Sequence, residues 1–410
     1  MHIDFNSYFA TVEQQANPRL RGKPIGVTGG DRLKRTVLGA ASVEAKKFGV
    51  KTGMQIWEAK QLCPTLILVA GDSDKYLETT KRFLNIIKDY SPYVEIFSID
   101  ECFLEVSTKD PVNIAQKIKI RIKQEVGDYI TCSIGISYNK IMAKLAGSLY
   151  KPDGLVMIAD EQAAQFILDR VELDEICGIG FRIKKRLNNM GVYNFKDLRK
   201  VPLPALLASF KSYGQILHNM ARGVDNSKVL PFYEKEEVKS IGHRHTIDHD
   251  TSDLEEIKQL FLKLTEMIAR RLRAKNLVGK TVSCWYRSAF VSNSWGSNVF
   301  NPGGWIASQT TIPYTNDGLE IFKAAWKIFH QIWNGDKIRM VGVSISNLKP
   351  HSPENLTFLE EKLRQQKIIK TLDKINDKYG EFTLQRGILL GSSNMERKPN
   401  PFLADRRFKI

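Results

Sequence analysis

The chain has 410 residues, of which 42% are hydrophobic and 26% are charged. These proportions are ordinary for a folded protein, and the length favours roughly two to four domains, because a single core rarely extends beyond about 300 residues. The 61 Lys and Arg residues outnumber the 45 Asp and Glu residues, which gives a formal net charge of +16. Such an excess predicts a polyanionic partner and favours a nucleic acid.

The sequence also argues against several classes of protein. It contains neither a long apolar run free of charges nor a basic amphipathic anchor, and its first residues, MHIDFNSYF, lack an apolar signal core. The five cysteines are scattered without a C-x-x-C pair, so neither a zinc site nor a disulfide framework is predicted. We therefore expect a cytoplasmic protein with no membrane association.

The first part of the chain predicts a mixture of strands and helices. Strands are expected at 1–5, 24–28, 93–97, 102–106 and 129–137, and helices at 8–16, 74–90, 111–126 and 139–150. The segment 40–54 predicts a further helix that ends at Gly49. This helix would carry Lys46 and Lys47 in its last turn, where the helix dipole favours cations.

From about residue 160 the pattern changes to short helices. Between Arg182 and Lys228, ten Lys and Arg residues face two acidic residues, a local excess of +8. The charged stretch 231–239, which begins with Pro, indicates a linker. Residues 240–349 then predict the order strand, long helix, two strands, helix and strand, as in an α/β sandwich. The tail predicts a helix at 359–379 and a short strand at 383–390.

The stretch FSIDECF, residues 97–103, sets Asp100 and Glu101 side by side between two predicted strands. A solvated hairpin turn would explain this pair, since Asp is common in turns. A metal site is the alternative. Mg²⁺ prefers oxygen ligands, and nucleotidyl transfer uses two ions about 3.5–4 Å apart, which need about three carboxylates from neighbouring strands. Asp4 lies in an otherwise apolar first strand, where a buried charge needs a partner, so the three carboxylates together favour the metal site.

Lys151 precedes a Pro-Asp-Gly turn and follows a predicted helix that carries Lys140 and Lys144 one turn apart. A triphosphate must be neutralised by cations as well as by metal, and a lysine held by a rigid turn can do this. For any single lysine of this group, an exposed side chain beside a turn is the simpler alternative.

The stretch 176–192, ICGIGFRIKKRLNNMGV, is the most specific short pattern in the chain. Gly178 and Gly180 allow backbone N–H groups at a helix N-terminus to approach an anion closely. Four cations follow at once: Arg182, Lys184, Lys185 and Arg186. This layout predicts a helix-hairpin-helix that grips a DNA phosphate without reading bases, with an ordinary αα-hairpin on a basic surface as the alternative.

Four aromatic residues lie among the predicted strands and the intervening loop of 240–349: Trp285, Tyr286, Trp295 and Trp305. Stacking on nucleic-acid bases is conceivable. We expect them to build a core instead, because aromatic strand residues usually do so.

Taken in order, these segments resemble the Y-family translesion DNA polymerases of the bacterial DNA polymerase IV type. The resemblance covers roughly residues 1–349 and rests on DFNSYFATVE, EAKKFGVKTGM, SIDE, GISYNKIMAKLAG, KPDGL, GIG with its second helix, and SIG. It implies an α+β multidomain fold shaped like a right hand. The implied parts are a mixed-sheet palm (1–7 and 73–159), small fingers (8–72), a helical thumb with the helix-hairpin-helix (160–231), a linker (232–239), an α/β little finger (240–349) and a tail (350–410).

The resemblance also implies roles for single residues. Asp4, Asp100 and Glu101 match the catalytic carboxylates, and the backbone carbonyl of Phe5 matches a further metal ligand. Two Mg²⁺ ions per site are implied. Asp4 and Asp100 would bridge them, while Glu101 would help to hold the catalytic metal and orient the primer end.

In the implied nucleotide pocket, Phe9 matches the steric gate, the aromatic residue that stacks under the sugar and excludes a ribose 2′-hydroxyl. Tyr8 lines the pocket beside it. Lys151 matches the palm lysine that binds the triphosphate, and Lys46 falls where the family commonly has a triphosphate-binding arginine.

The chain departs from the family pattern at several positions. Val43 stands where a tyrosine is common, Ala40 where a threonine or serine is frequent, and Lys46 cannot form the bidentate fork of an arginine. These departures suggest weaker or differently organised nucleotide binding. Asn6 stands where many relatives have a second Asp, and we expect no ligand role for it.

Residues 353–361, PENLTFLEE, lie where relatives carry a sliding-clamp peptide. In that interpretation the clamp is a partner and the contact residues are Asn355, Leu356, Phe358 and Leu359. A helix N-terminus capped near Ser352 or Asn355 is the alternative.

The implied activity is Mg²⁺-dependent, low-fidelity DNA synthesis past damaged bases by a monomer on primed template DNA. The primer 3′-hydroxyl attacks the α-phosphate of a deoxynucleoside triphosphate and releases pyrophosphate. Two alternatives stay open. One is a catalytically silent DNA-binding scaffold in damage tolerance, whose usual sign would be loss of the carboxylates. The other is a DNA-backbone-binding module in which the acidic pair is only a turn.

Overall fold

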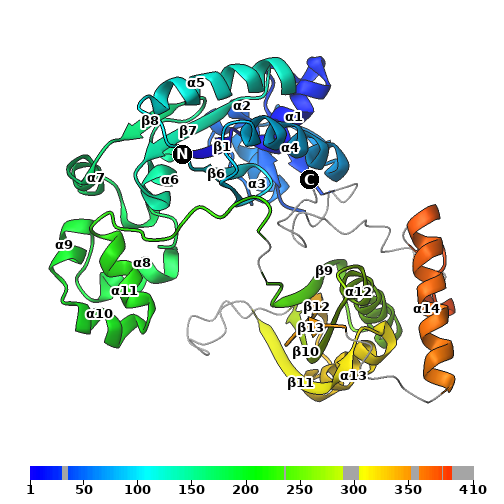
Figure 1. Ribbon diagram of the computed structural model, residues 1–410. Helices are drawn as coiled ribbons and strands as arrows, with labels where there is room; N and C mark the ends of the chain where they lie inside the picture. Colours follow the sequence, from blue (N-terminus) through cyan, green and yellow to red (C-terminus); the bar gives the residue numbers. More distant parts are fainter. Residues whose placement is uncertain (30–35, 235–236, 290–303, 352–359, 381, 390–410) are drawn as a thin grey trace. The chain divides into compact units, whose positions relative to one another are not determined.

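The computed structural model describes all residues except 30–35, 235–236, 290–303, 352–359, 381 and 390–410. The chain divides into a first unit built from Met1–Lys235 and a second unit built from Glu236–Ala404. Figure 1 shows the strands and helices of both units. Among the described residues, no helix has both the length and the apolar character that crossing a membrane requires.

The largest sheet of the first unit has five strands in the order β5-β6-β1-β7-β8. These strands are Val94–Ile96, Glu101–Leu104, His2–Phe5, Cys132–Ser137 and Leu155–Ile158. β1 pairs antiparallel with both β6 and β7, whereas β7 and β8 are parallel and are connected through α6 (Lys140–Leu149). β5 and β6 form an antiparallel hairpin, which confirms that the acidic pair lies at the junction of two strands.

Alternation along β1 separates an apolar face from a polar one. Ile3 and Phe5 are buried, and the Phe5 ring lies 4.1 Å from that of Phe83 in α4 (Ser73–Lys88). His2 and Asp4 lie on the opposite face, which is covered by α6. Figure 1 shows α5 (Pro111–Arg121) and α6 on opposite sides of the strands.

Two glycines bring α6 unusually close to the sheet. A Cβ atom on Gly135 of β7 would lie 2.0 Å from the Ala143 carbonyl oxygen and 2.2 Å from the Gly147 nitrogen. No side chain fits in that space, so the contact requires glycine. A Cβ atom on Gly147 would in turn lie 3.4 Å from Nδ1 of His2, so α6 also packs directly against the polar face of β1.

A second, three-stranded sheet has the order β3-β2-β4, formed by Ala40–Ala41, Ile25–Thr28 and Ile67–Ala70. α1 (Tyr8–Ala16) follows β1, and α2 (Val43–Lys47) and α3 (Ile56–Leu62) flank this sheet. The prediction of a helix from residue 40 is wrong at its start, because residues 40–41 pair with β2 and Ser42 caps α2 by accepting a hydrogen bond from the Ala45 N–H.

The predicted run of short helices is confirmed between residues 161 and 220. It consists of α7 (Glu161–Leu168), α8 (Phe181–Asn189), α9 (Phe195–Lys200), α10 (Leu203–Phe210) and α11 (Tyr213–Met220). The chain then returns to the five-stranded sheet, where the Leu230 N–H donates to Glu95 Oε2 at 3.0 Å.

The second unit is a four-stranded antiparallel sheet in the order β11-β10-β12-β9, with α12 and α13 over one face. The order of strands and helices predicted for 240–349 is confirmed. The elements are β9 (Ser240–Thr251), α12 (Leu254–Ala274), β10 (Leu277–Ser288), β11 (Trp305–Thr315), α13 (Gly318–Ile332) and β12 (Ile338–Ser346), followed by β13 (Lys349–Pro350), which pairs with β10.

The aromatic residues of this unit divide between the two faces of the sheet. Tyr286 is fully buried in the core, as predicted, and its hydroxyl donates to the Ile332 carbonyl at 3.1 Å. Trp285 is half-buried on the opposite face, so close to Gly342 that a Cβ there would lie 2.3 Å from its ring. Trp305 pairs with Arg287 on that same face and is half-buried. A core position is therefore wrong for both tryptophans, because side chains alternate along a strand. Trp295 lies outside the described residues.

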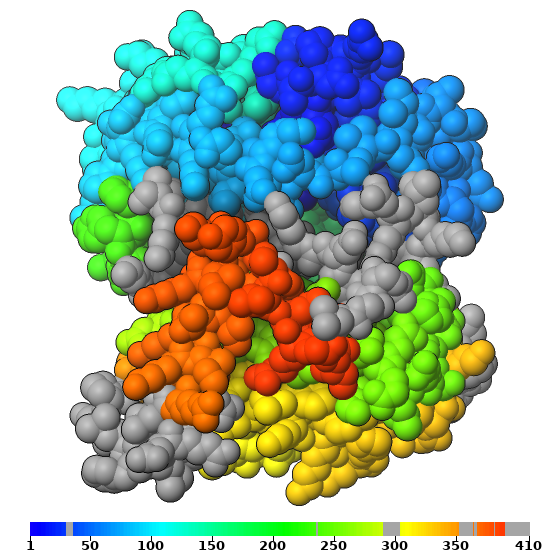
Figure 2. Space-filling model, turned by 90° about the vertical axis from the view of Figure 1, so that its right-hand side faces the viewer, coloured from blue at the N-terminus to red at the C-terminus, as the bar shows by residue number. Residues whose placement is uncertain are grey.

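The tail packs on the helical side of the second unit. α14 (Glu360–Tyr379) confirms the predicted helix, and Figure 2 shows it in orange on the surface. Arg273 Nε lies 2.6 Å from Asp373, and Arg270 lies 2.6 Å from Asp377, which joins α14 to α12. The predicted strand at 383–390 is wrong, since Gly387–Leu389 form a 3₁₀ turn that inserts Leu389 into the core.

Candidate active site

Three carboxylates meet where β1 and β6 lie side by side. Asp4 of β1 and Glu101 of β6 are directly opposite each other in the antiparallel register, and Asp100 precedes Glu101. The Asp100 carbonyl accepts a hydrogen bond from the Phe5 N–H at 3.0 Å, which fixes this corner of the backbone. Like charges directly opposite in a sheet are destabilising, so this arrangement requires compensating cations.

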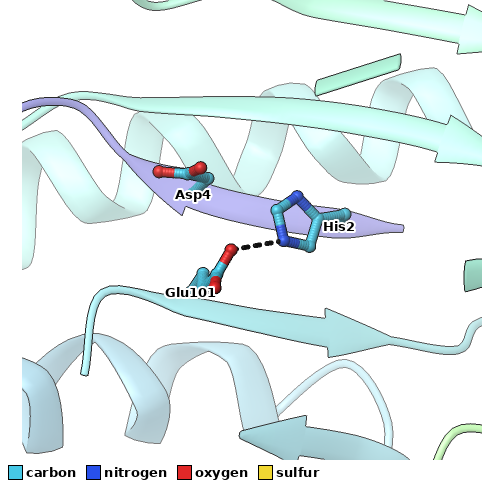
Figure 3. A group of neighbouring side chains, drawn as sticks. All are labelled: His2, Asp4 and Glu101. Carbon is cyan, nitrogen blue, oxygen red and sulfur yellow. Dashed lines mark hydrogen bonds and ion pairs between the residues drawn. The ribbon is translucent and has the colours of Figure 1, made fainter. Parts of the chain in front are cut away.

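Two lysines and a histidine contact these carboxylates. Lys151 Nζ lies 2.6 Å from Asp4 Oδ2. Lys144, on α6, forms an ion pair with Glu101 Oε2, and His2 Nε2 lies 3.0 Å from the same oxygen. Figure 3 shows His2 and Asp4 on β1, with the His2 ring directed to Glu101 across the strand pair.

The carboxylates differ in their proton affinities. Burial raises the pKa of Asp100, and the charges of Asp4 and Glu101 raise it further. A hydrogen bond from Ser98 lowers this pKa but does not outweigh them. Burial would also raise the pKa of Glu101, but hydrogen bonds from His2 and Lys144 outweigh it and lower that pKa to about 2. Excess negative charge is therefore concentrated around Asp100, which is the environment that a divalent cation would relieve.

Asp4 and Asp100 line a cavity of about 500 Å³ whose other walls come from α1, α2 and the turn at Lys151. Burial lowers the pKa of Lys46, and the nearby charge of Lys151 adds to this effect while Asp4 and Asp100 oppose it. The cavity thus combines two carboxylates from the sheet region with three lysines. Its lining is Asp4, Phe5, Asn6, Ser7, Tyr8, Phe9, Gly39, Ala40, Val43, Lys46, Lys47, Thr52, Asp100, Lys151 and Pro152.

The Phe9 ring at this cavity is held from behind by α4. It stacks on Tyr76 with ring centroids 4.4 Å apart and planes at 16°. The Tyr76 hydroxyl donates to Glu13 at 2.8 Å, and Lys75 pairs with the same carboxylate at 2.8 Å. Tyr8 also lines the cavity, but its hydroxyl donates to the Tyr76 carbonyl at 2.8 Å, so its contribution there comes from the ring and backbone.

Asn6 is buried and supports the turn that presents Lys151. Its Oδ1 accepts hydrogen bonds from the Asp153 N–H at 2.8 Å and from the Thr131 hydroxyl at 3.1 Å, and its Nδ2 donates to Ser133 at 2.9 Å. These bonds give Asn6 a structural role in holding the turn.

The helix-hairpin-helix residues do not all face solvent. Gly178 has φ +111°, which favours glycine, and Gly180 is the N-cap of α8. Arg182 and Lys185 are exposed. Lys184, in contrast, lies 2.7 Å from Asp174 and 3.1 Å from Glu172. Of the cations predicted to bind DNA here, Lys184 is therefore occupied by acidic neighbours that precede the motif.

The four residues predicted for clamp binding, Asn355, Leu356, Phe358 and Leu359, lie outside the described residues. Sequence reasoning missed His2 and Tyr76, and it noted Lys144 on its helix without connecting it to Glu101. The one available signal for His2 was its position two residues before Asp4, which puts both side chains on one face of the strand.

Comparisons with known proteins identify the family of this chain. A family model described as the impB/mucB/samB family matches residues 3–148, the model of its C-terminal domain matches 238–358, and a model described as the thumb domain of DNA polymerase-iota matches 174–225. DNA polymerase IV of Pelotomaculum thermopropionicum is 37% identical over 403 residues, which cover 96% of each chain. This chain belongs to the Y family of DNA polymerases. It is thus a DNA-directed DNA polymerase of the translesion class.

Other Y-family members support the same assignment. DNA polymerase IV of Moorella thermoacetica is 36% identical over 397 residues, which cover 94% of this chain and 95% of that protein. The solved structure of a Y-family DNA polymerase chimera superposes with a TM-score of 0.71 and covers 85% of this chain and 98% of its own. At 24% identity this last likeness concerns the fold alone.

The hydrogen bonds of Asn6 can be tested by stability. Asn6→Ala is expected to lower the free energy of unfolding by about 1–3 kcal/mol, because buried donors and acceptors lose their partner. Urea unfolding followed by circular dichroism measures the change. Substitution of the exposed Asn113 by Ala is the control and should stay within about 0.5 kcal/mol of the parent. Equal effects of the two substitutions would contradict the role given to Asn6.

Proposed function

We propose that this polymerase extends DNA primers by a two-metal mechanism centred on Asp4, Asp100 and Glu101. The observation that carries the proposal is their convergence beside a cavity that is also lined by three lysines. As a member of its family, the enzyme depends on divalent metal and acts on DNA and nucleotides. Mg²⁺ is our choice of ion, since all the candidate ligands offer oxygen.

The residues fit two such ions. Asp4, Asp100, Glu101 and the Phe5 carbonyl would hold them, and Glu101 would also orient the primer end. Bound Mg²⁺ would stabilise charge on the attacking and leaving oxygens. The protein's own contribution is then to position the primer 3′-hydroxyl and the α-phosphate and to exclude competing geometries.

The remaining cavity residues bind the nucleotide in this proposal. Lys46 and Lys151 would contact the triphosphate, with Lys46 as a single point charge rather than a bidentate fork. Phe9, braced by Tyr76, would lie under the sugar and leave no room for a 2′-hydroxyl. Tyr8 would complete the wall beside it.

We assign the parts of the hand as the sequence predicts them: palm at 1–7 and 73–159, fingers at 8–72, thumb at 160–231, linker at 232–239 and little finger at 240–349. Gly178, Gly180, Arg182 and Lys185 would hold a DNA backbone phosphate. We further propose that the protein acts as a monomer in the cytoplasm and that residues 355–359 bind the sliding clamp, for which the sequence pattern is the support.

A catalytically silent scaffold is the second candidate. A scaffold has no need to place two carboxylates at a cavity that also holds three lysines, with a third carboxylate, Glu101, directly opposite Asp4, so we favour the enzyme. Primer extension separates the two.

The carboxylates are tested by primer extension with Mg²⁺ on a primed template. The double variant Asp100→Ala/Glu101→Ala should lose at least about 10²–10³-fold in rate, because charge in the transition state is no longer stabilised. Its DNA affinity should stay unchanged. Substitution of the exposed Glu78 by Ala is the matched control. Extension by the double variant at the parent rate would refute the assignment of the site, and failure of the parent itself to extend would favour the scaffold.

The steric gate is tested by sugar discrimination. Phe9→Ala should lower the ratio of kcat/KM for deoxynucleotides over ribonucleotides at least about tenfold, since a pocket that rejects a group by shape loses that ability when the wall is removed. Phe9→Tyr keeps the ring and should keep most of the discrimination. Single-nucleotide incorporation kinetics give both values. An unchanged ratio in Phe9→Ala would remove this residue from the role.

The hairpin is tested through the salt dependence of DNA binding. The slope of log K against log salt concentration is negative, and each lost phosphate contact reduces its magnitude by about 0.9. Lys185→Ala should show this loss, whereas Lys184→Ala should change the slope little, because Glu172 and Asp174 already hold that ammonium group. Fluorescence anisotropy with a labelled duplex at four salt concentrations measures the slopes. A larger effect of Lys184→Ala would reverse the assignment.

A further inference from the structure

Two donors of different kind converge on one oxygen of Glu101. His2 Nε2 and Lys144 Nζ both contact Oε2, the imidazole from the same sheet and the ammonium from α6. A carboxylate can only accept, so His2 must carry its proton on Nε2. Figure 3 shows the ring of His2 aimed along this direction, beside Asp4 on the same strand.

The two donors differ in freedom. The His2 side chain is 2% exposed and is enclosed between the sheet and Gly147 of α6. Lys144 is 22% exposed, and its ammonium also lies 4.6 Å from the centre of the Phe97 ring. A flexible four-carbon chain allows Lys144 to move toward solvent when another cation arrives, whereas the imidazole has no alternative position.

The position of His2 carries a cost that packing alone does not explain. Among the residues that the structure describes, no hydrogen-bond partner reaches its buried Nδ1. A buried polar atom without a partner is destabilising, and a phenylalanine ring would fill the same space without that cost. We therefore attribute the presence of a histidine at this position to the hydrogen bond that its Nε2 donates to Glu101.

We propose that His2 is a positioning residue for Glu101 and that Lys144 is a built-in counter-ion that competes with the divalent cation for the same carboxylate. His2 fixes the orientation of the carboxylate without cancelling its charge. Lys144 neutralises Glu101, opposite Asp4, until a cation takes its place. This inference rests on the proposed function of the site.

The two roles predict opposite effects on metal affinity. His2→Phe should weaken binding of Mn²⁺, which accepts the same oxygen ligands, by about 10- to 100-fold, the usual effect of removing a residue that orients a ligand. His2→Gln, which offers an N–H of similar reach, should recover part of the loss. Lys144→Met should tighten binding about tenfold or more, because the competing charge is removed.

The measurement is the electron paramagnetic resonance signal of free Mn²⁺, titrated with the full chain without DNA or nucleotide. Asp100→Ala/Glu101→Ala gives the baseline for binding elsewhere. Lys140→Met is the matched control, because Lys140 lies on the same helix and pairs with Glu95 at 2.9 Å instead. Circular dichroism melting of each variant shows whether it is folded. If His2→Phe does not fold, the Mn²⁺ affinity of His2→Gln provides the test of His2.

The outcomes separate the inference from the function on which it rests. Opposite shifts for His2→Phe and Lys144→Met, with parental affinity in Lys140→Met, support it. Parental affinity in all three variants overturns the inference and leaves the metal site intact. No binding above baseline by the parent protein overturns the proposed metal site together with the inference. No recovery in His2→Gln assigns His2 to packing and overturns its positioning role.

Discussion

The first unit is organised around one unfavourable electrostatic arrangement, the placement of Asp4 directly opposite Glu101 in an antiparallel strand pair. Two carboxylates so close, with Asp100 beside them, would destabilise the sheet without compensation. The surrounding structure supplies it. The turn after α6 delivers Lys151 to Asp4, α6 delivers Lys144 to Glu101, and β1 itself delivers His2. The metal and nucleotide site that we propose therefore uses the same charges that oppose folding.

The acidic part of this arrangement could be predicted from the sequence. Asp100 and Glu101 lie between two short apolar runs, which predict the two strands of a hairpin, and Asp4 interrupts an otherwise apolar strand. Each of these signals is local, so they could be recognised although Asp4 lies far from Asp100 in the sequence. The compensating contacts could not be predicted in the same way. Whether Lys144 or Lys140 reaches Glu101 depends on where α6 crosses the sheet, and Lys140 is in fact taken by Glu95. Likewise, Lys184 belongs to a motif that predicts DNA contact, yet two acids before the motif occupy it.

In the second unit the order of elements followed from hydrophobic periodicity, while the face on which a residue lies did not. Tyr286 and Trp285 are neighbours in sequence and lie on opposite sides of β10. Composition cannot distinguish them, because in the described part of this unit the helices cover one face of the sheet only. The tail shows a similar limit. Leu389 is anchored in the core by a 3₁₀ turn, and an apolar run of that length suits a strand equally well.

The contact between Gly135 and Gly147 has a consequence for how this active site can vary. The two glycines set the distance between α6 and the sheet, and therefore the length of side chain that can span from position 144 to Glu101. A side chain at residue 135 would collide with the backbone of α6 and push the helix outward, which would leave the lysine too short to reach Glu101. We therefore expect the effects of substitutions at residues 135 and 144 to be coupled rather than additive.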